Sequence, residues 1–128
     1  MKALITGSLG FVGGYLRREL EGHGYEVTGL DIRPGDRTIQ ADLLNAGEIQ
    51  RIVAEEKPDA IFHLAGQADV GRSWKIPQAT MEINVVASIN LMEAVRVSRP
   101  EARMVLIGSS DQYGNLGETG ANVSEELE

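Results

Sequence analysis

A glycine-rich turn between an apolar strand and an amphipathic helix most constrains how this chain can fold. The apolar run Lys2–Thr6 leads into Gly7–Gly13, with the sequence GSLGFVG, and a helix is predicted over Phe11–His23. Glycines spaced three residues apart allow a tight turn and let a pyrophosphate approach the helix N-terminus, where free N–H groups and the helix dipole bind anions. Because any strand-to-helix turn uses glycine, this motif alone leaves a purely structural turn as an equal alternative.

Short apolar runs alternate with longer stretches of helical period through the rest of the sequence, which is typical of stacked βαβ units around a parallel sheet. Further strands are predicted at Glu26–Leu30, Thr38–Ala41, Ala60–Leu64 and Arg103–Ser109, and further helices at Asn45–Lys57 and Pro77–Ser98. The apolar residues expected to face the core are Val12, Leu16 and Leu20 in the first helix, Ile49, Ile52 and Val53 in the second, and Met81, Val85, Ile89, Met92 and Val95 in the third. We therefore predict an α/β fold with a Rossmann-type, doubly wound parallel sheet of about five strands.

An acidic residue at the end of the second predicted strand supports a ligand site at the glycine turn. Asp31 lies 21 residues after Gly10, and dinucleotide sites place an acid about 20 residues on, where it binds the ribose hydroxyls. A turn-forming acid is the alternative, but strand, glycines and spacing agree on a dinucleotide site. A carboxylate there repels the extra phosphate of NADP and favours NAD, whereas the guanidinium of Arg33 could hold that phosphate.

Composition excludes several other classes of function. The 128 residues, 42% of them hydrophobic, suffice for one domain with a core. The net charge of −7 disfavours a nucleic-acid partner. With no cysteine and two histidines, neither a disulfide nor a metal cluster is expected. No apolar run approaches the roughly 18 residues of a membrane span, and the start of the chain does not resemble a signal peptide, so we expect a cytoplasmic protein without a membrane partner.

Several motifs follow one another in a fixed order along the chain. They are TGSLGFVG at Thr6–Gly13, Asp42-Leu43, HLAGQ at His63–Gln67, Asn84-Val85, and SSDQYG at Ser109–Gly114. In this order they resemble the extended short-chain dehydrogenase/reductases, which are NAD-dependent nucleotide-sugar epimerases, dehydratases and reductases. The resemblance covers the chain from Lys2 to about Gly114. The stretch His63–Trp74 looks most like the GDP-mannose 4,6-dehydratases and the GDP-4-keto-6-deoxymannose reductases.

The resemblance implies a cofactor-binding role for each matching residue, with NAD as the expected cofactor and NADP as the alternative. Asp42 and Leu43 would contact the adenine, unless Asp42 is merely an acid that precedes a helix. The segment Ala65–Gln67 would pass under the ribose and phosphates. Asn84 would lie near the nicotinamide, unless it faces solvent. The full predicted set is Gly7, Leu9, Gly10, Phe11, Val12, Gly13, Asp31, Ile32, Arg33, Asp42, Leu43, Leu64, Ala65, Gly66, Gln67 and Asn84.

The resemblance also implies two catalytic residues, Ser109 and Asp111. The Ser109 hydroxyl would hydrogen-bond the sugar's C4 oxygen during hydride exchange between C4 and the nicotinamide. Asp111 stands where the dehydratases carry Glu, and its shorter side chain favours reduction or epimerisation over dehydration. We interpret His63 as a packed strand-end residue rather than a catalyst. Trp74 either stacks on a base or fixes its own loop.

Catalysis in this family also needs a tyrosine followed four residues later by a lysine, and the sequence contains no such pair. Tyr15, Tyr25 and Tyr113 are followed at that distance by Glu19, Gly29 and Gly117. By the family's spacing the pair would come just past Glu128. We therefore expect a dinucleotide-binding domain at 1–113, an acidic and loosely ordered tail at 114–128, no C-terminal substrate lobe, and no turnover by this chain.

The sequence is compatible with three functions. The leading one is the cofactor half of an enzyme that acts on a nucleotide sugar, and the second is a non-catalytic dinucleotide sensor, for which Ser109 and Asp111 would have no use. The third is a structural domain without a ligand, which the glycines and Asp31 disfavour. Self-association is also expected, because Arg103–Ser109 should form an uncovered edge of the sheet. The family's dimer packs the helix matching Pro77–Ser98 and the helix that bears the catalytic tyrosine, which this sequence lacks, so the resemblance leaves the oligomeric state open.

Overall fold

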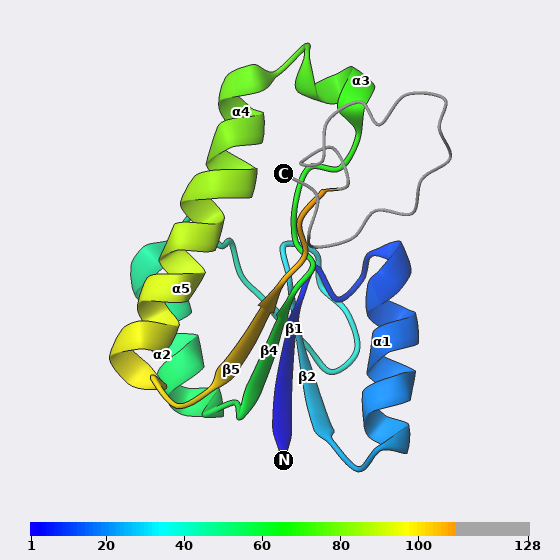
Figure 1. Cartoon of the computed structure of the whole chain (residues 1–128), viewed down its shortest axis with the longest axis vertical. Coiled ribbons are helices and arrows are strands. Elements are labelled where there is room, and N and C mark those ends of the chain that lie inside the picture. Colours follow the sequence, from blue (N-terminus) through cyan, green and yellow to red (C-terminus); the bar gives the residue numbers. More distant parts are fainter. Residues whose placement is uncertain (110–128) are drawn as a thin grey trace, which may run out of the picture.

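The computed structural model describes residues 1–109 of the chain (Figure 1), and its centre is a sheet of five parallel strands. The strands are β1 Lys2–Thr6, β2 Glu26–Asp31, β3 Thr38–Gln40, β4 Ala60–His63 and β5 Arg103–Leu106, in the spatial order β3-β2-β1-β4-β5. In the middle of the sheet, Leu4 aligns with Thr28 on one side and with Ile61 on the other. The predicted fold class is confirmed.

Helices cover both faces of the sheet. They are α1 Phe11–Gly22, α2 Ala46–Glu56, α3 Val70–Ser73, α4 Pro77–Met81, the π-helical turn η1 Glu82–Val86, and α5 Ala87–Ser98. Figure 1 shows α1 on one side of the strands, α2 and α5 on the other, and a continuous helical rod from α4 to α5. None of the helices in residues 1–109 combines the length and the apolar character needed to cross a lipid bilayer.

The two faces of each strand belong to two separate cores, because successive side chains of a strand point to opposite sides. The larger core lies under α2 and α5 and includes Leu4, Leu30, Ile49, Ile61 and Leu91. The smaller core lies under α1 and is formed by Ala3, Ile5, Leu20 and Val27. As a consequence, the even-numbered residues of β1 face α5, and this places Thr6 toward that helix.

Local signals explain where α2 begins and ends. The side chain of Asn45 accepts the backbone N–H of Glu48 at 3.3 Å, which caps the first turn of the helix. At the other end Lys57 takes a left-handed conformation with φ of 50° and Pro58 follows, so the helix cannot continue. This helix matches its sequence prediction closely.

The structure corrects the predicted inner face of the long helix. Of the five residues expected there, Val95 is buried, whereas Met81, Val85, Ile89 and Met92 are 40–60% exposed. The buried face of α5 consists instead of Ala87, Leu91, Ala94 and Val95. The reason is the turn η1, in which the Ala87 N–H bonds the carbonyl of Glu82, five residues back, and so breaks the 3.6-residue period.

Two smaller expectations are also wrong. Val12 is 53% exposed, because it stands in the first turn of α1, beyond the strand ends. The last strand ends at Leu106 rather than Ser109, since its partner β4 ends at His63, which pairs with Leu106. As expected, β5 forms an edge of the described sheet. The predicted tail at 114–128 lies outside the described residues.

Candidate functional site

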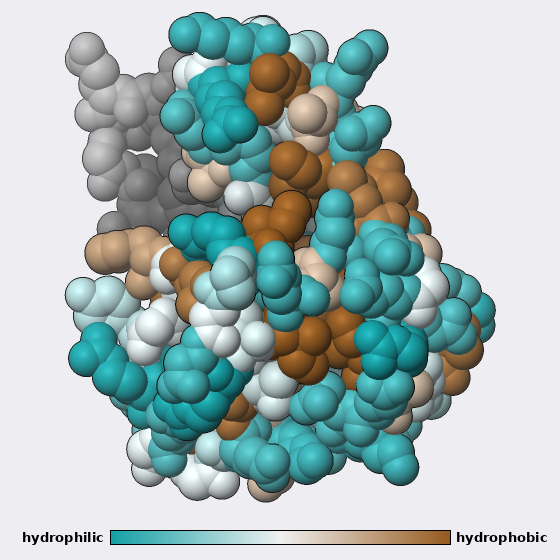
Figure 2. All heavy atoms as spheres, turned by 180° about the vertical axis from the view of Figure 1, so that it is seen from behind, coloured by the Kyte–Doolittle hydropathy of each residue, from teal (hydrophilic) through white to brown (hydrophobic). Residues whose placement is uncertain are grey.

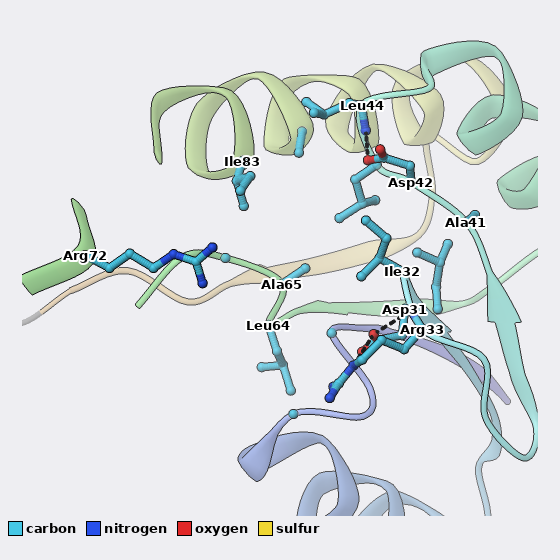
Figure 3. A pocket seen from close by; sticks show the side chains of 16 residues that line it. Asp31, Ile32, Arg33, Ala41, Asp42, Leu44, Leu64, Ala65, Arg72 and Ile83 are labelled. Atoms are coloured by element: carbon cyan, nitrogen blue, oxygen red, sulfur yellow. Dashed lines mark hydrogen bonds and ion pairs between the residues drawn. The ribbon is translucent and has the colours of Figure 1, made fainter. Parts of the chain in front are cut away.

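A pocket of about 500 Å³ opens at the carboxyl ends of the central strands (Figure 3). The strand order reverses between β1 and β4, the position where doubly wound sheets bind ligands. Ten of the sixteen predicted cofactor residues line it: Gly7, Gly10, Asp31, Ile32, Arg33, Asp42, Leu43, Leu64, Ala65 and Gly66. Leu9, Phe11, Val12, Gly13, Gln67 and Asn84 are not in its wall.

The glycine turn forms one wall of the pocket from backbone atoms. Gly7 has φ of +66°, and a side chain there would place its Cβ 2.8 Å from the backbone nitrogen of Ala65. Gly10 ends the turn as the N-cap of α1, and no side chain in residues 1–109 caps that helix. A Cβ at Gly10 would lie 3.0 Å from the carbonyl oxygen of Gly7. Gly10 therefore leaves the first N–H groups of α1, at the edge of the pocket, without a side-chain cap from residues 1–109, and helix N-termini of this kind bind anions such as a diphosphate.

Asp31 is a buried carboxylate with three hydrogen bonds. Its Oδ2 accepts the backbone N–H of Leu9 at 3.0 Å, and its Oδ1 accepts the backbone N–H and the Nε of Arg33 at 3.1 and 3.2 Å. Burial alone would raise the pKa of Asp31, but the bonds from Arg33 and Leu9 and the charge of Arg33 hold that pKa below its ordinary value. A carboxylate has about four acceptor positions, so this anion can also accept a ribose hydroxyl.

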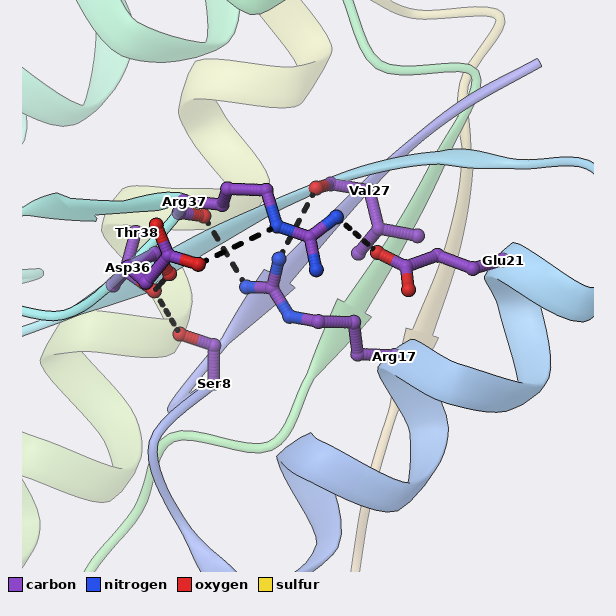
Figure 4. Close-up of polar contacts among 7 residues, drawn as sticks. All are labelled: Ser8, Arg17, Glu21, Val27, Asp36, Arg37 and Thr38. Carbon is purple, nitrogen blue, oxygen red and sulfur yellow. Dashed lines mark hydrogen bonds and ion pairs between the residues drawn. The ribbon is translucent and has the colours of Figure 1, made fainter.

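The loop between β2 and β3, which carries Ile32 and Arg33, is fastened to α1 (Figure 4). Arg17 donates to the carbonyl of Val27 at 3.3 Å and to that of Arg37 at 3.2 Å. Arg37 in turn donates to Glu21 at 2.7 Å. The bonds of Arg37 hold the far end of the loop against α1.

The segment Asp42–Leu44 lines the far end of the pocket. Asp42 Oδ1 accepts the backbone N–H of Leu44 at 2.9 Å, while the backbone carbonyls of Leu43 and Leu44 accept Asn90 of α5 at 2.9 and 3.3 Å. Asn45 rather than Asp42 caps α2, so Asp42 serves as a turn residue with one oxygen left toward the pocket. An adenine amine is the kind of donor that such an oxygen accepts.

Asn84 lies on the exposed side of η1, but its side chain binds the loop that follows β4. Asn84 Oδ1 accepts the backbone N–H of Gln67 at 2.6 Å, and its Nδ2 donates to the Gln67 carbonyl at 3.1 Å. A Cβ at Gly66 would lie 3.2 Å from the same Oδ1. The loop Leu64–Gln67 is thus held against the pocket by a two-point amide contact.

Arg72 was not predicted from the sequence, and the structure places it in the pocket wall with Ile83 and Ala87. Figure 3 shows the Arg72 side chain reaching from α3 toward Ala65. Within residues 1–109 its guanidinium makes no hydrogen bond or ion pair. Arg72 lies in the stretch His63–Trp74, which carries part of the family resemblance, and this could have indicated a role. The spacing of residues along the sequence does not show that the stretch returns to the pocket that the glycine turn lines.

The remaining predicted residues lie in three different settings. His63 is buried in the sheet, as interpreted from the sequence, and burial lowers its pKa. Trp74 is 83% exposed at the end of α3. Ser109 is exposed, three residues beyond the end of β5, and Asp111 lies outside the described residues. No three histidine, aspartate or glutamate side chains in the described part of the chain gather as metal ligands.

Comparison with known proteins identifies the family. The family model described as "NAD dependent epimerase/dehydratase family" matches residues 3–128. The chain belongs to this family. Its predicted resemblance to nucleotide-sugar epimerases, dehydratases and reductases is thereby confirmed.

Individual members of the epimerase/dehydratase family share about a third of the sequence. The UDP-glucose 4-epimerase of Mycolicibacterium smegmatis is 35% identical over 77% of this chain and 36% of its own length. The GDP-mannose 4,6-dehydratase of Vibrio cholerae is 30% identical over 92% of this chain and 38% of its own. The crystal structure of the Thermus thermophilus UDP-glucose 4-epimerase complex with NAD superposes with a TM-score of 0.87 at 30% identity, over 99% of this chain and 43% of that one. This epimerase/dehydratase chain thus spans about two fifths of the length of the curated relatives that it matches.

Proposed function

We propose that these residues form the NAD-binding part of an enzyme that exchanges hydride with C4 of a nucleotide sugar. One observation carries the proposal: the ionised Asp31 stands in the same pocket as the glycine turn, 3.0 Å from the Leu9 N–H. The Asp31 carboxylate suits ribose hydroxyls, and the glycine turn suits a diphosphate. The NAD-bound relative and the sugar nucleotides named in the relatives support the assignment.

Each wall of the pocket has its own part in binding. When bound, NAD supplies the hydride acceptor, and every other task falls to the chain. Asp31 accepts the ribose hydroxyls, the N–H groups that follow Gly10 bind the diphosphate, and Asp42 accepts the adenine amine. Asn84 fixes the loop of Gln67 beside the nicotinamide end. NAD is favoured over NADP because the Asp31 anion repels a 2′-phosphate and already pairs with Arg33.

Arg72 adds a positive charge at the diphosphate part of the pocket. Its guanidinium extends toward Ala65 in the pocket that Gly7 and Gly10 also line, and no acidic side chain in residues 1–109 neutralises it. Guanidinium groups bind phosphate oxygens through two parallel hydrogen bonds. We assign Arg72 to the cofactor's diphosphate, opposite the N–H groups of α1.

The catalytic assignments follow the family resemblance. Ser109 hydrogen-bonds the sugar's C4 oxygen, and Asp111 takes the position of the dehydratases' Glu. Because the sequence has no tyrosine followed four residues later by lysine, we propose that this 128-residue chain binds cofactor without turnover. A measurable oxidation or reduction of UDP-glucose or GDP-mannose above a no-protein control contradicts that statement.

Calorimetric titration tests the proposed function. We expect the chain to bind NAD and to bind NADP more weakly, and we expect Asp31→Asn to remove most of the NAD affinity. The matched control is Asp36→Asn, an exposed acid of the same loop whose side chain lies 3.8 Å from Arg37. If a folded wild-type chain binds neither NAD nor NADP, the proposed function is wrong. The alternative, a non-catalytic sensor, predicts the same cofactor binding. It differs from the enzyme in that a sensor has no use for the Ser109 hydroxyl.

We also propose that two copies associate through the outer face of the α4–α5 rod. Seen from behind (Figure 2), apolar side chains gather along this rod, where Met81, Val85, Ile89 and Met92 form one exposed stripe. Exposed apolar stripes of this kind mark protein–protein contacts, and a second copy offers a matching stripe. The edge of β5, with Val105 45% exposed, offers the other surface for self-association.

A further inference from the structure

A chain of hydrogen bonds crosses the core between the glycine turn and the rod, with His63 at its centre. The imidazole Nδ1 lies 2.6 Å from Thr6 Oγ1 of β1, and Nε2 lies 2.8 Å from Ser88 Oγ of α5. Thr6 Oγ1 also accepts the backbone N–H of Ala65 at 3.3 Å, and Ser88 Oγ donates to the backbone carbonyl of Asn84 at 2.8 Å. This series of hydrogen bonds therefore ends, on both sides, at backbone groups of segments that line the pocket.

These contacts fix the positions of the protons. A carbonyl oxygen can only accept, so the Ser88 hydroxyl hydrogen points to Asn84. Ser88 Oγ must then accept from His63, which places the imidazole proton on Nε2. The bare Nδ1 accepts the Thr6 hydroxyl, and Thr6 Oγ1 accepts Ala65. The chain of bonds runs in one direction, and the neutral Nε2–H tautomer satisfies every member of it.

We propose that His63, as the neutral Nε2–H tautomer, is a positioning residue that holds the loop Ala65–Gln67 and Asn84 in place for the cofactor. One arm fixes Ala65 through Thr6. The other fixes the Asn84 backbone through Ser88, and Asn84 then holds Gln67 by its two-point amide contact. This inference rests on the proposed function, since the loop matters only if a dinucleotide lies against it.

Protonation of His63 conflicts with this arrangement. A proton on Nδ1 would face Thr6 Oγ1, and the Thr6 hydroxyl hydrogen would then lose its acceptor in the chain of bonds. Within residues 1–109 no acidic side chain contacts the imidazole to compensate for the added charge. The side chains that face the imidazole are Thr6 from β1 and Ser88 from α5, its pairing partner on β5 is Leu106, and no charged group of residues 1–109 shifts its titration.

Cofactor binding and protonation of His63 should therefore oppose each other. We expect the affinity for NAD to fall between about pH 7.5 and about pH 5.5, and by less than about tenfold, because burial holds the pKa of His63 below its ordinary value and so limits its protonation at the lower pH. Adenosine, which has no phosphate that titrates in this range, should contact the Asp31 and Asp42 end and not the loop, so its affinity should stay constant. Asp31 stays ionised throughout because its pKa is held below the ordinary value.

Two-dimensional ¹H–¹⁵N spectra of the imidazole groups give the direct test. The chain has two histidines, and the exposed His23 serves as the internal reference. We expect the neutral Nε2–H tautomer at His63 at pH 7. An Nδ1–H tautomer or a charged ring at that pH overturns the proposal, and this readout does not depend on whether the chain binds NAD.

The matched variants separate positioning from general stability. Ser88→Ala removes the link to Asn84, Ser88→Thr keeps the hydroxyl, and Ser98→Ala is the same deletion at the other end of α5. We expect Ser88→Ala alone to lose the Nε2–H preference and about threefold to tenfold in NAD affinity, with adenosine binding unchanged. If the Ser88→Ala chain loses the Nε2–H preference but still binds NAD as tightly as the wild-type chain does, the proposal is wrong. A wild-type chain that fails to bind NAD instead overturns the proposed function.

Discussion

Asp31 accepts a hydrogen bond from the backbone N–H of Leu9 across 3.0 Å, which ties the end of β2 to the glycine turn. The bond joins two parts of the proposed dinucleotide site that are 22 residues apart in the chain. Arg33 binds the other carboxylate oxygen, so these contacts hold both the orientation and the ionised state of the Asp31 side chain. If NAD binds as we propose, the positions of its ribose and diphosphate are therefore set relative to each other before the ligand arrives.

Replacing Asp31 should affect both binding and the pH dependence of stability. We expect Asp31→Asn to lower NAD affinity by about tenfold or more, since hydrogen bonds to a charged group are lost. The pKa of Asp31 is lower in the folded chain than the unfolded value of about 3.9. The ionised group therefore contributes stability above that value, and the contribution disappears as pH falls through the folded pKa.

Urea unfolding of wild type and Asp31→Asn from about pH 7 down to about pH 3 measures this effect. The difference in unfolding free energy should be constant above about pH 5 and should shrink below about pH 4. A difference that grows toward acid pH is incompatible with a lowered pKa at Asp31.

Replacement by alanine should change the stability of the chain in opposite directions at two adjacent glycines of α1. A Cβ at Gly13 would overlap the backbone of Ser8, whereas a Cβ at Gly14 meets no atom within 4 Å. We expect Gly13→Ala to destabilise the chain by about 1–3 kcal/mol and Gly14→Ala to stabilise it by about 0.5–1 kcal/mol. Thermal unfolding of the two variants side by side checks the pair. Equal effects would mean that Ser8 does not pack against the helix as described.

Arg72 should contribute to binding but not to folding, because its guanidinium has no partner in residues 1–109. We expect Arg72→Ala to weaken both NAD and ADP-ribose by about tenfold, to leave adenosine unchanged, and to leave the melting temperature as it is. Lys75→Ala, at a neighbouring exposed position, is the control. An equal loss for adenosine would show that Arg72 does not act on the diphosphate.

The exposed stripe of the α4–α5 rod should control self-association. Sedimentation velocity of the wild-type chain is expected to show a dimer, and Ile89→Lys should convert it to monomer because a charge then enters an apolar contact. Val105→Lys places the same charge on the β5 edge and should leave the dimer intact. If Val105→Lys gives the monomer and Ile89→Lys does not, association runs through the edge of the sheet.

The sequence was most informative where one local pattern determines the structure. The strand–glycine–helix unit and the spacing from Gly10 to Asp31 predicted the first half of the pocket correctly, because both depend on the backbone of contiguous segments. The inner face of the long helix could not be predicted in this way. A single π turn at Glu82–Val86 shifts the period, and the apolar residues Met81 and Val85 fit the buried pattern equally well.

Other parts of the site depend on contacts between distant segments. Arg72 enters the pocket only because the segment after β4 folds back over the strand ends, and nothing in its neighbours along the chain indicates this. Asn84 illustrates the same limit. The sequence left a ligand-facing and a solvent-facing interpretation, and in the structure its amide binds the backbone of Gln67 instead.

The close approach of Gly7 to the backbone of Ala65 has a broader consequence. At this point main chain lies directly on main chain, with no side chain between them. A surface built in this way keeps its shape when surrounding side chains are replaced, since no replacement reaches it. We therefore expect the relatives named for UDP-glucose and for GDP-mannose, which agree with this chain at about three positions in ten, to keep this backbone contact.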